Sequence, residues 1–384
     1  MSDSEFVEIE VYGRSAAAAP GTALREALSS LGQALAARGG APFHMISMTW
    51  LVPDVAAFNP KHHAFDLCYR EVFGGFRPPI GVSKSPDGEF VVQARARIPR
   101  AAPSEPVWHG FALPELAREY SPRNQVPSMD ALFARWSKDG QDFRSGHKCI
   151  EIAYGASEFE KLDVFLPPGT KAAPPLWVFI HGGYWQASDK DQHAQFAAGM
   201  LQAGYAVAML NYGLCPDVPL ESIVGQVRSA LLFLVSKSKD LGIDPDSIHV
   251  AGHSAGGHLA AMAAADITMP PVRSALLLSG LYDLAPLALL PVGRLIGVTT
   301  PQAVEHLSPI RHRPRPGVKI AVAVGGLESK EFKWQSAELA RVWGVPPPLV
   351  VQGANHFSLL DGLIEGDLLT FALETASRSR SRLA

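Results

Sequence analysis

The chain has 384 residues, of which 47% are hydrophobic, and its formal net charge is -3 at pH 7. The length favours two domains, and the nearly balanced charge gives no electrostatic basis for binding nucleic acid or an anionic membrane. The three cysteines are far apart and form no C-x-x-C pair, which is typical of reduced thiols in the cytoplasm. No signal-peptide pattern is present, and no apolar run reaches the roughly 18 residues that span a bilayer. We therefore expect a cytoplasmic protein.

The first hundred residues predict a small α+β domain. Its strand candidates are rich in β-branched and aromatic residues, and its helix candidates repeat apolar residues at helical spacing. The predicted strands are 6–12, 44–52 and 90–98, and the predicted helices are 23–38 and 65–72. The expected order is therefore βαβαβ over residues 1–100.

A Pro- and Ala-rich stretch at 98–106 predicts a linker, and the sequence pattern changes after it. Residues 107–150 lack a strand pattern. Beyond them, near-continuous apolar strands alternate with helix-length segments, which is typical of a parallel, doubly wound sheet. The predicted strands are 176–180, 205–210, 248–252, 274–280, 318–324 and 348–353. The sequence thus predicts an α/β domain over 105–384.

The predicted strand 248–252 runs into GHSAG, with Ser254 at its centre, and a strong helix-forming stretch follows at 258–266. In this strand–turn–helix context, a G-x-S-x-G serine stands exposed on a strained bend and acts as a nucleophile. An ordinary glycine-rich turn would match the same short pattern. The residues at the ends of the other strands decide between the two interpretations.

The predicted strand 176–180 ends in the sequence HGGYW. Acyl transfer needs backbone N–H groups aimed at the oxyanion that develops on the substrate, and glycine lets the backbone come close enough. We expect three amides to form this oxyanion hole, those of Gly182, Gly183 and Ala255. Tyr184 and Trp185 are candidates for lining an aromatic leaving-group pocket, although both could equally be core residues.

His356 is the last histidine of the chain and follows the final predicted strand. Its imidazole could reach Ser254 there, in the chain order nucleophile, acid, histidine. Three carboxylates could orient it. Glu328 follows the strand just before that of the histidine, Asp283 follows an earlier strand, and Glu331 falls within a predicted helix. Because the acid must touch the histidine, Glu328 is favoured, and Asp283 is interpreted as a cap or turn residue.

Seven stretches of the second domain together point to a known family. They are LAREYSPRNQVP, YGASEFEKLDVFLPPG, HGGYWQ, GHSAGGHLAAM, SGLYDLAPL, LSP and ESKEFKWQS. Over 105–384 they resemble the arylformamidase (kynurenine formamidase-like) branch of the α/β-hydrolases. The resemblance implies a nucleophile at Ser254, a base at His356 and an acid at Glu328, where many members carry aspartate.

For function, the resemblance implies cleavage of a small acyl group, such as formyl, from an aromatic amide or ester. We expect no metal and no organic cofactor to be needed for this acyl-transfer chemistry. A short-chain carboxylesterase would use the same residues and is the first alternative. The second is a non-enzymatic, oligomeric binding protein that carries an inert hydrolase domain, and the intact triad argues against it.

Within the first domain, TWLVPD, CYREVFGGFRPPIGV and FVVQARARI resemble the reactive-intermediate deaminase (YjgF/L-PSP-like) family, whose fold is chorismate-mutase-like. That family grips a substrate carboxylate with an arginine in a Pro-Ala-Arg stretch. This chain has Pro78, Pro79 and Ile80 there instead. Because the family is typically trimeric, the resemblance implies an assembly domain in a homo-oligomer rather than an active deaminase.

Overall fold

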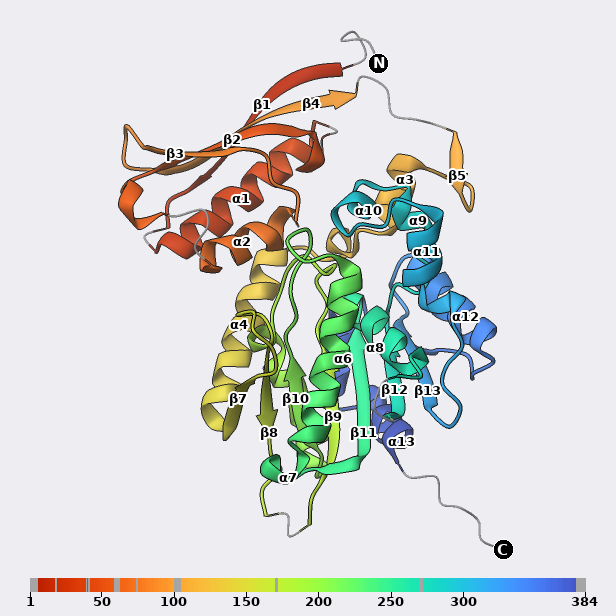
Figure 1. Ribbon diagram of the computed structural model, residues 1–384. Helices are drawn as coiled ribbons and strands as arrows, with labels where there is room; N and C mark the ends of the chain where they lie inside the picture. Colours follow the sequence, from red (N-terminus) through yellow and green to blue (C-terminus); the bar gives the residue numbers. More distant parts are fainter. Residues whose placement is uncertain are drawn as a thin grey trace, which may run out of the picture. The chain divides into compact units, whose positions relative to one another are not determined.

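The computed structural model describes residues 6–17, 19–38, 40, 42–58, 63–73, 75–99, 105–169, 172–268 and 272–377. It divides into two compact units (Figure 1). The first is Met1–Glu115 with Gln186–Ser188, and the second is Leu116–Trp185 with Asp189–Ala384. Part of the predicted linker, residues 100–104, lies outside the described residues.

The first unit is a four-stranded sheet in the order β1-β4-β2-β3, with two helices packed on one of its faces (Figure 1). The strands are β1 (Phe6–Ser15), β2 (Met45–Val52), β3 (Ile80–Lys84) and β4 (Phe90–Pro99), and the helices are α1 (Pro20–Ala36) and α2 (His63–Phe73). Strand β4 is antiparallel to β1 and β2, whereas β2 and β3 are parallel. Apolar side chains from both helices and the sheet form the core of this unit.

The predicted order βαβαβ misses strand β3. This strand has five residues, and their side chains are half-buried or exposed. It therefore shows no apolar alternation that sequence reasoning could detect. Its partner β2 does alternate, and its buried positions were correctly predicted to belong to a strand.

The second unit is built on an eight-stranded sheet in the order β14-β13-β12-β11-β9-β10-β8-β7. The strands are β7 (Cys149–Ala153), β8 (Lys161–Phe165), β9 (Pro175–Ile180), β10 (Ala206–Leu210), β11 (Asp244–His253), β12 (Val272–Leu278), β13 (Lys319–Gly325) and β14 (Leu349–Val351). In this order, all neighbouring strands from β14 through β9 to β10 are parallel to each other. Strand β8 is antiparallel to both of its neighbours, β10 and β7. The sheet is therefore mixed rather than purely parallel. Polar residues in β7 and β8 interrupt the apolar runs, which is why these two strands were not predicted.

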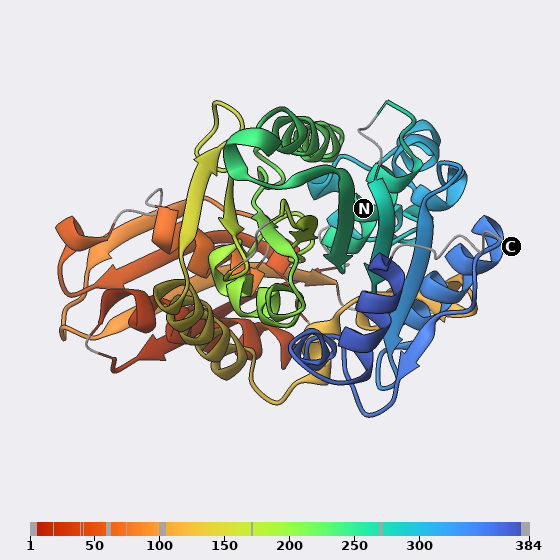
Figure 2. The ribbon, with the colours of Figure 1, turned by 90° about the horizontal axis from the view of Figure 1, so that it is seen from below.

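Helices cover both faces of this sheet (Figures 1 and 2). Helix α8 packs on β11 and β12 with α6 beside it, while α13 packs against β12 and β13 with α5 near β10. The helices of this unit are α4 (Met129–Gly146), α5 (Ala198–Gln202), α6 (Leu220–Ser236), α7 (Ser238–Leu241), α8 (Ala255–Ala265), α12 (Lys330–Trp343) and α13 (Asp367–Ala376). Helix α3 (Leu113–Glu119) spans the boundary between the two units. Ten of the eleven residues of α8 are buried, as expected of a helix at the centre of a doubly wound domain.

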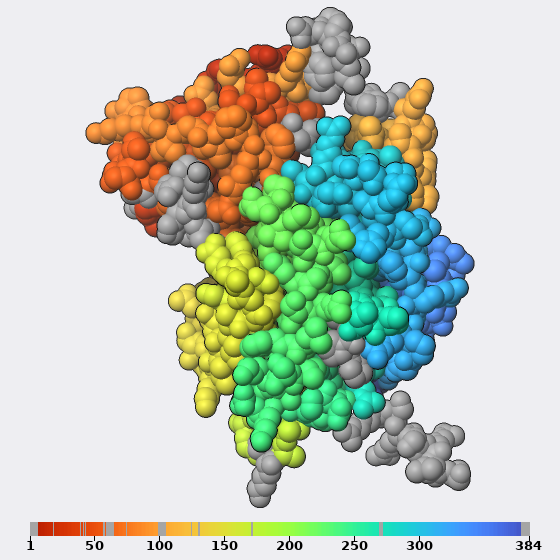
Figure 3. Space-filling model, viewed as in Figure 1, coloured from red at the N-terminus to blue at the C-terminus, as the bar shows by residue number. Residues whose placement is uncertain are grey.

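The connection from β12 to β13 carries three short helices, α9 (Ala285–Ala288), α10 (Pro291–Leu295) and α11 (Pro301–Leu307). This blue segment lies at the surface of the second unit in Figure 3. The other connections at the carboxyl ends of the parallel strands are shorter and hold the candidate catalytic residues. In open α/β sheets, ligand sites form at this edge.

Candidate active site

Ser254 stands at a sharp turn between β11 and α8. Its backbone has a φ of 56° and a ψ of -118°, a conformation that costs a non-glycine residue about 1–3 kcal/mol. The turn is held because Ser254 N–H donates to the Leu278 carbonyl of the neighbouring strand at 2.8 Å, and His258 N–H donates to the Ser254 carbonyl at 3.1 Å. The strain is therefore fixed by the sheet on one side and by the helix on the other.

The two glycines that flank this turn are required by close backbone approach. A Cβ on Gly252 would lie 2.0 Å from the carbonyl oxygen of Gly256. A Cβ on Gly256 would lie 2.0 Å from the carbonyl oxygen of Ile180, at the end of β9. No side chain fits at such distances without moving the backbone. The two glycines therefore let the turn close tightly and let the start of α8 lie against the end of β9.

His356 follows β14, and its Nδ1 lies 2.7 Å from Oε2 of Glu328, which follows β13. Both side chains are almost fully buried. A carboxylate only accepts hydrogen bonds, so Nδ1 carries the proton and Nε2 presents a lone pair. This is the tautomer that a general base requires.

His253, the last residue of β11, links His356 to the strand that leads to Ser254. Its Nε2–H donates to the main-chain carbonyl of His356 at 2.8 Å, and the two rings lie 4.6 Å apart. Burial, with smaller contributions from His356 and His193, holds the pKa of His253 well below 6.5. A neutral ring at this position avoids placing a second positive charge beside His356 when His356 is protonated.

The loop after β9 brings its glycines to Ser254. A Cβ on Gly182 would lie 3.1 Å from the Ser254 Cβ, so the backbone of the two segments is in contact. Gly183, Tyr184 and Trp185 all have positive φ, at 108°, 54° and 55°. Glycine adopts a positive φ freely, so the backbone strain of the loop lies at Tyr184 and Trp185.

Hydrogen bonds from within the domain hold this strained loop. Tyr212 Oη donates to the carbonyls of His181 at 2.8 Å and Gly182 at 3.3 Å, and His181 Nδ1 donates to the Gly182 carbonyl at 2.7 Å. Burial lowers the pKa of His181 to about 4, so its ring is neutral. Sequence reasoning missed Tyr212, because nothing in the residues around it signals a contact with a loop 30 residues earlier.

Tyr184 and Trp185 lie in different surroundings. Tyr184 is half-buried, and its hydroxyl donates to the Tyr120 carbonyl at 2.5 Å. Trp185 has no exposed surface, and its ring meets that of His258 edge-on at 4.9 Å. Their role in lining a leaving-group pocket stays a prediction.

The two other carboxylates considered for the acid point elsewhere. Asp283 Oδ1 accepts from Ala285 N at 2.9 Å and its Oδ2 pairs with Arg311 at 3.3 Å, so it closes the turn that starts α9. Glu331 lies in the first turn of α12, where its Oε2 accepts from Tyr120 Oη at 3.0 Å. Only Glu328 of the three candidates is hydrogen-bonded to His356 in the part of the chain that the structure describes.

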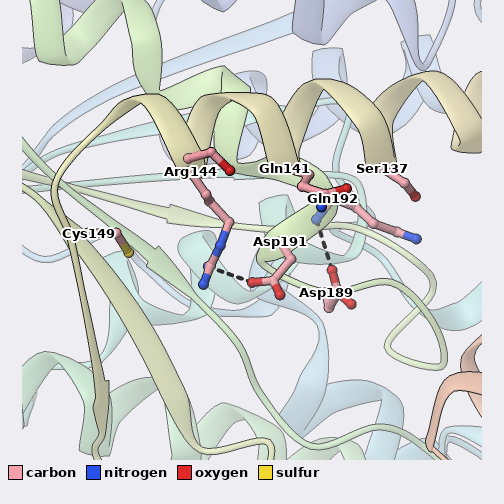
Figure 4. Close-up of a pocket in the computed structure, with 8 residues that line it drawn as sticks. Ser137, Gln141, Arg144, Cys149, Asp189, Asp191 and Gln192 are labelled. Atoms are coloured by element: carbon pink, nitrogen blue, oxygen red, sulfur yellow. Dashed lines mark hydrogen bonds and ion pairs between the residues drawn. The ribbon is translucent and has the colours of Figure 1, made fainter.

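A surface pocket of about 510 Å³ lies elsewhere in the second unit (Figure 4). It is lined by residues of α4, by Cys149 and by the segment 189–192, and Arg144 donates to Asp191 there at 2.6 Å. None of the candidate catalytic residues lines it. Within the described residues, no group of three or more His, Cys, Asp or Glu side chains is placed to hold a metal ion.

The sequence of this chain is similar to those of several known proteins. The family model described as BD-FAE matches residues 162–270. Kynurenine formamidase of Danio rerio is 31% identical over 283 residues, which covers 68% of this chain and 95% of the relative. The chain belongs to the arylformamidase-like family of α/β-hydrolases. Kynurenine formamidase of Salmo salar is 29% identical over 282 residues, which covers 68% of this chain and 94% of the relative.

Solved structures agree with the family at the level of the fold. A candidate thioesterase from Silicibacter sp. TM1040 is 32% identical with a TM-score of 0.61, covering 66% of this chain and 97% of that one. An esterase from Pyrobaculum calidifontis has a TM-score of 0.52 at 20% identity, covering 68% and 94% of the two chains. This member of the arylformamidase-like family is a serine hydrolase of the arylformamidase or esterase type. No described helix of it is long and apolar enough to cross a membrane.

Proposed function

We propose that Ser254, His356 and Glu328 form the catalytic triad of an aryl-formamide hydrolase. The observation that carries the proposal is the 2.7 Å hydrogen bond from His356 Nδ1 to Glu328. Ser254 stands on a strained strand-to-helix turn, and its neighbour His253 donates to the His356 carbonyl. A hydroxyl is a weak nucleophile until a neighbouring base takes its proton. The paired imidazole, with a free lone pair on Nε2, supplies that base.

The reaction has two halves. Ser254 Oγ attacks the acyl carbon while His356 Nε2 takes its proton, and the imidazolium then gives the proton to the leaving nitrogen or oxygen as that bond breaks. Water next attacks the acyl-enzyme with His356 again as base, which releases the acid and restores Ser254. Glu328 accepts the hydrogen bond from His356 Nδ1 throughout and stabilises the imidazolium.

The negative charge that develops on the carbonyl oxygen would be held by the amides of Gly182, Gly183 and Ala255. The contact between Gly182 and Ser254 and the position of Ala255 as the first residue of α8 support this assignment. The first amides of a helix lack internal partners and lie at its positive end. Each donor of this kind is worth roughly 10²–10³ in rate.

For the substrate, we propose a formyl or other small acyl group on an aromatic amine. The matched relatives are kynurenine formamidases, and N-formylkynurenine is the aryl formamide we would test first. An aniline nitrogen leaves more easily than an alkyl amine because the ring withdraws charge from it. A formyl group has only hydrogen on its carbonyl carbon, so it crowds the site least.

A second candidate is a short-chain carboxylesterase. The observation that favours it is the likeness to solved esterases and to a candidate thioesterase, which covers about two thirds of this chain. The same triad would act on both ester and amide. The two functions differ in whether the enzyme protonates a nitrogen leaving group well enough to cleave an amide.

The test combines a covalent probe with a substrate panel. A fluorophosphonate should label wild-type protein at Ser254 and leave Ser254→Ala unlabelled, with kcat lowered by on the order of 10⁶. kcat/KM should be highest for formyl and fall through acetyl, butyryl and octanoyl derivatives of one aromatic leaving group. Labelling at another serine would contradict the triad. A maximum at octanoyl without formamide turnover would favour the esterase.

We also propose that the first unit is a YjgF/L-PSP-like assembly domain of a cytoplasmic homo-oligomer. Its four-stranded sheet with two helices on one face supports the idea of a self-contained module. Its partners would be copies of the same chain, with a small aromatic amide or ester as the substrate of the second unit.

A further inference from the structure

Ser279 follows β12 and is completely buried at the carboxyl edge of the sheet. Its φ of 46° is in the left-handed region, which glycine prefers. The backbone is held there because Ser279 N–H donates to the Ala323 carbonyl of β13 at 2.9 Å. A serine in a glycine-like conformation, with no exposed surface, calls for an explanation by its side chain.

The Ser279 hydroxyl donates to Oε1 of Glu328 at 2.5 Å. The same oxygen accepts from the Gly325 N–H at 2.7 Å, and the other carboxylate oxygen, Oε2, accepts from His356 Nδ1. The carboxylate thus has three donors, of which two share the oxygen that faces away from the histidine.

We propose that Ser279 is a positioning residue whose hydroxyl fixes the Glu328 carboxylate so that Oε2 stays aimed at His356. This proposal rests on the proposed triad. A glutamate has one more rotatable bond than an aspartate, and its terminal torsion is broad. The Gly325 amide alone would let the carboxylate turn about that contact. A second donor on Oε1, from a different strand end, fixes the plane of the group.

The groups packed against this pair come from β11, the loop after β12 and α12, whose Lys333 Nζ donates to the Gly326 carbonyl at 3.5 Å. His253 on β11 is kept neutral by burial, which holds its pKa well below 6.5. Tyr282, in the loop after β12, is kept neutral because burial raises its pKa far above 10. Phe332 of α12 packs on the His356 ring at 4.6 Å and is apolar. A pH profile is therefore compared between each variant and the wild type.

The test uses the full-length chain with Ser279→Ala and Ser279→Gly. Both variants remove the hydroxyl, and the glycine also relieves the positive φ, so a purely conformational role predicts that Ser279→Gly keeps its activity. We expect kcat on 4-nitrophenyl acetate to fall about tenfold to a hundredfold in both, the loss that one hydrogen bond to a charged group produces. KM should stay close to the wild-type value. Ser336→Ala is the matched control, because the Ser336 hydroxyl is buried without a hydrogen-bond partner in the described structure.

The pH dependence gives a second readout. A carboxylate that turns away stabilises the imidazolium less, so the acidic limb of kcat/KM should move to lower pH in Ser279→Gly. Wild-type kcat and an unmoved limb in that variant would overturn the proposal, and so would a limb that moves to higher pH. Fluorophosphonate labelling of Ser254 separates the proposed triad from the proposed role of Ser279. A wild-type protein that is not labelled at Ser254 contradicts the triad itself. Labelled Ser254 together with fully active Ser279 variants contradicts only the role of Ser279.

Discussion

At the scale of single residues, the site depends on which proton each buried group carries. The Glu328 carboxylate accepts three hydrogen bonds, and this fixes the proton of His356 on Nδ1. His253 must carry its proton on Nε2, since it donates to a carbonyl. A buried site built in this way has little tolerance for a partner that donates where an acceptor is needed.

Glu328→Gln tests this dependence. An amide can turn its NH₂ toward His356 and impose the other tautomer, which removes the lone pair on Nε2, so we expect kcat to fall by on the order of 10⁴. Asp283→Asn is the matched control, because it breaks only the ion pair to the half-exposed Arg311, and we expect kcat within a few-fold of wild type. Steady-state kinetics with circular dichroism of each variant measures this. If Asp283→Asn were the folded but inactive protein, the acid would be Asp283.

At the scale of elements, the strand-to-helix turn depends on close backbone contacts that leave no room for a side chain at Gly252 and Gly256. The Gly256→Ala methyl group would lie 2.0 Å from the Ile180 carbonyl, so β9 and the start of α8 would have to separate. We expect a lower melting temperature, from about 1–3 kcal/mol of overpacking, and loss of Ser254 labelling. The separation would also move Gly182 away from Ser254.

Gly225→Ala is the control for that variant. Gly225 lies inside α6 with no atom within 4 Å of an added Cβ, so alanine there should raise stability by about 0.5–1 kcal/mol and leave labelling unchanged. Thermal unfolding and fluorophosphonate labelling of both variants measure the difference. Normal labelling in a stable Gly256→Ala protein would contradict the packing argument.

The sequence predicts those elements and residues that a short, continuous pattern of residues identifies. The apolar strands β9 to β14 and the helix after Ser254 could be predicted, since each combines a long apolar run with a clear stop. Strands β7 and β8 could not, because the ion pairs of Glu151 and Asp163 place charges within them. The contact of Glu328 with His356 could be expected from the order of strand ends. The contacts of Ser279 and Tyr212 depend on side-chain geometry across separate strand ends, which no short pattern encodes.

At the scale of the whole molecule, the two units have separate hydrophobic cores. The core of the first is made of residues between 9 and 98, and that of the second of residues between 126 and 376. The candidate triad lies wholly in the second unit. Tyr120, just after α3, is also part of that unit and is hydrogen-bonded to Glu331 and Gln335.

A shortened chain beginning at Glu105 tests whether these cores make two independent domains. We expect it to fold and to be labelled by a fluorophosphonate at Ser254, because it retains every residue of the second core and the segment that holds Tyr120. Its oligomeric state by light scattering should be lower than that of the full chain, because the proposed assembly domain is absent. The matched control is the isolated segment 1–104, which should self-associate when its oligomeric state is measured by light scattering. An insoluble or unlabelled fragment would contradict domain independence, and a fragment with the oligomeric state of the full chain would place assembly in the hydrolase unit instead.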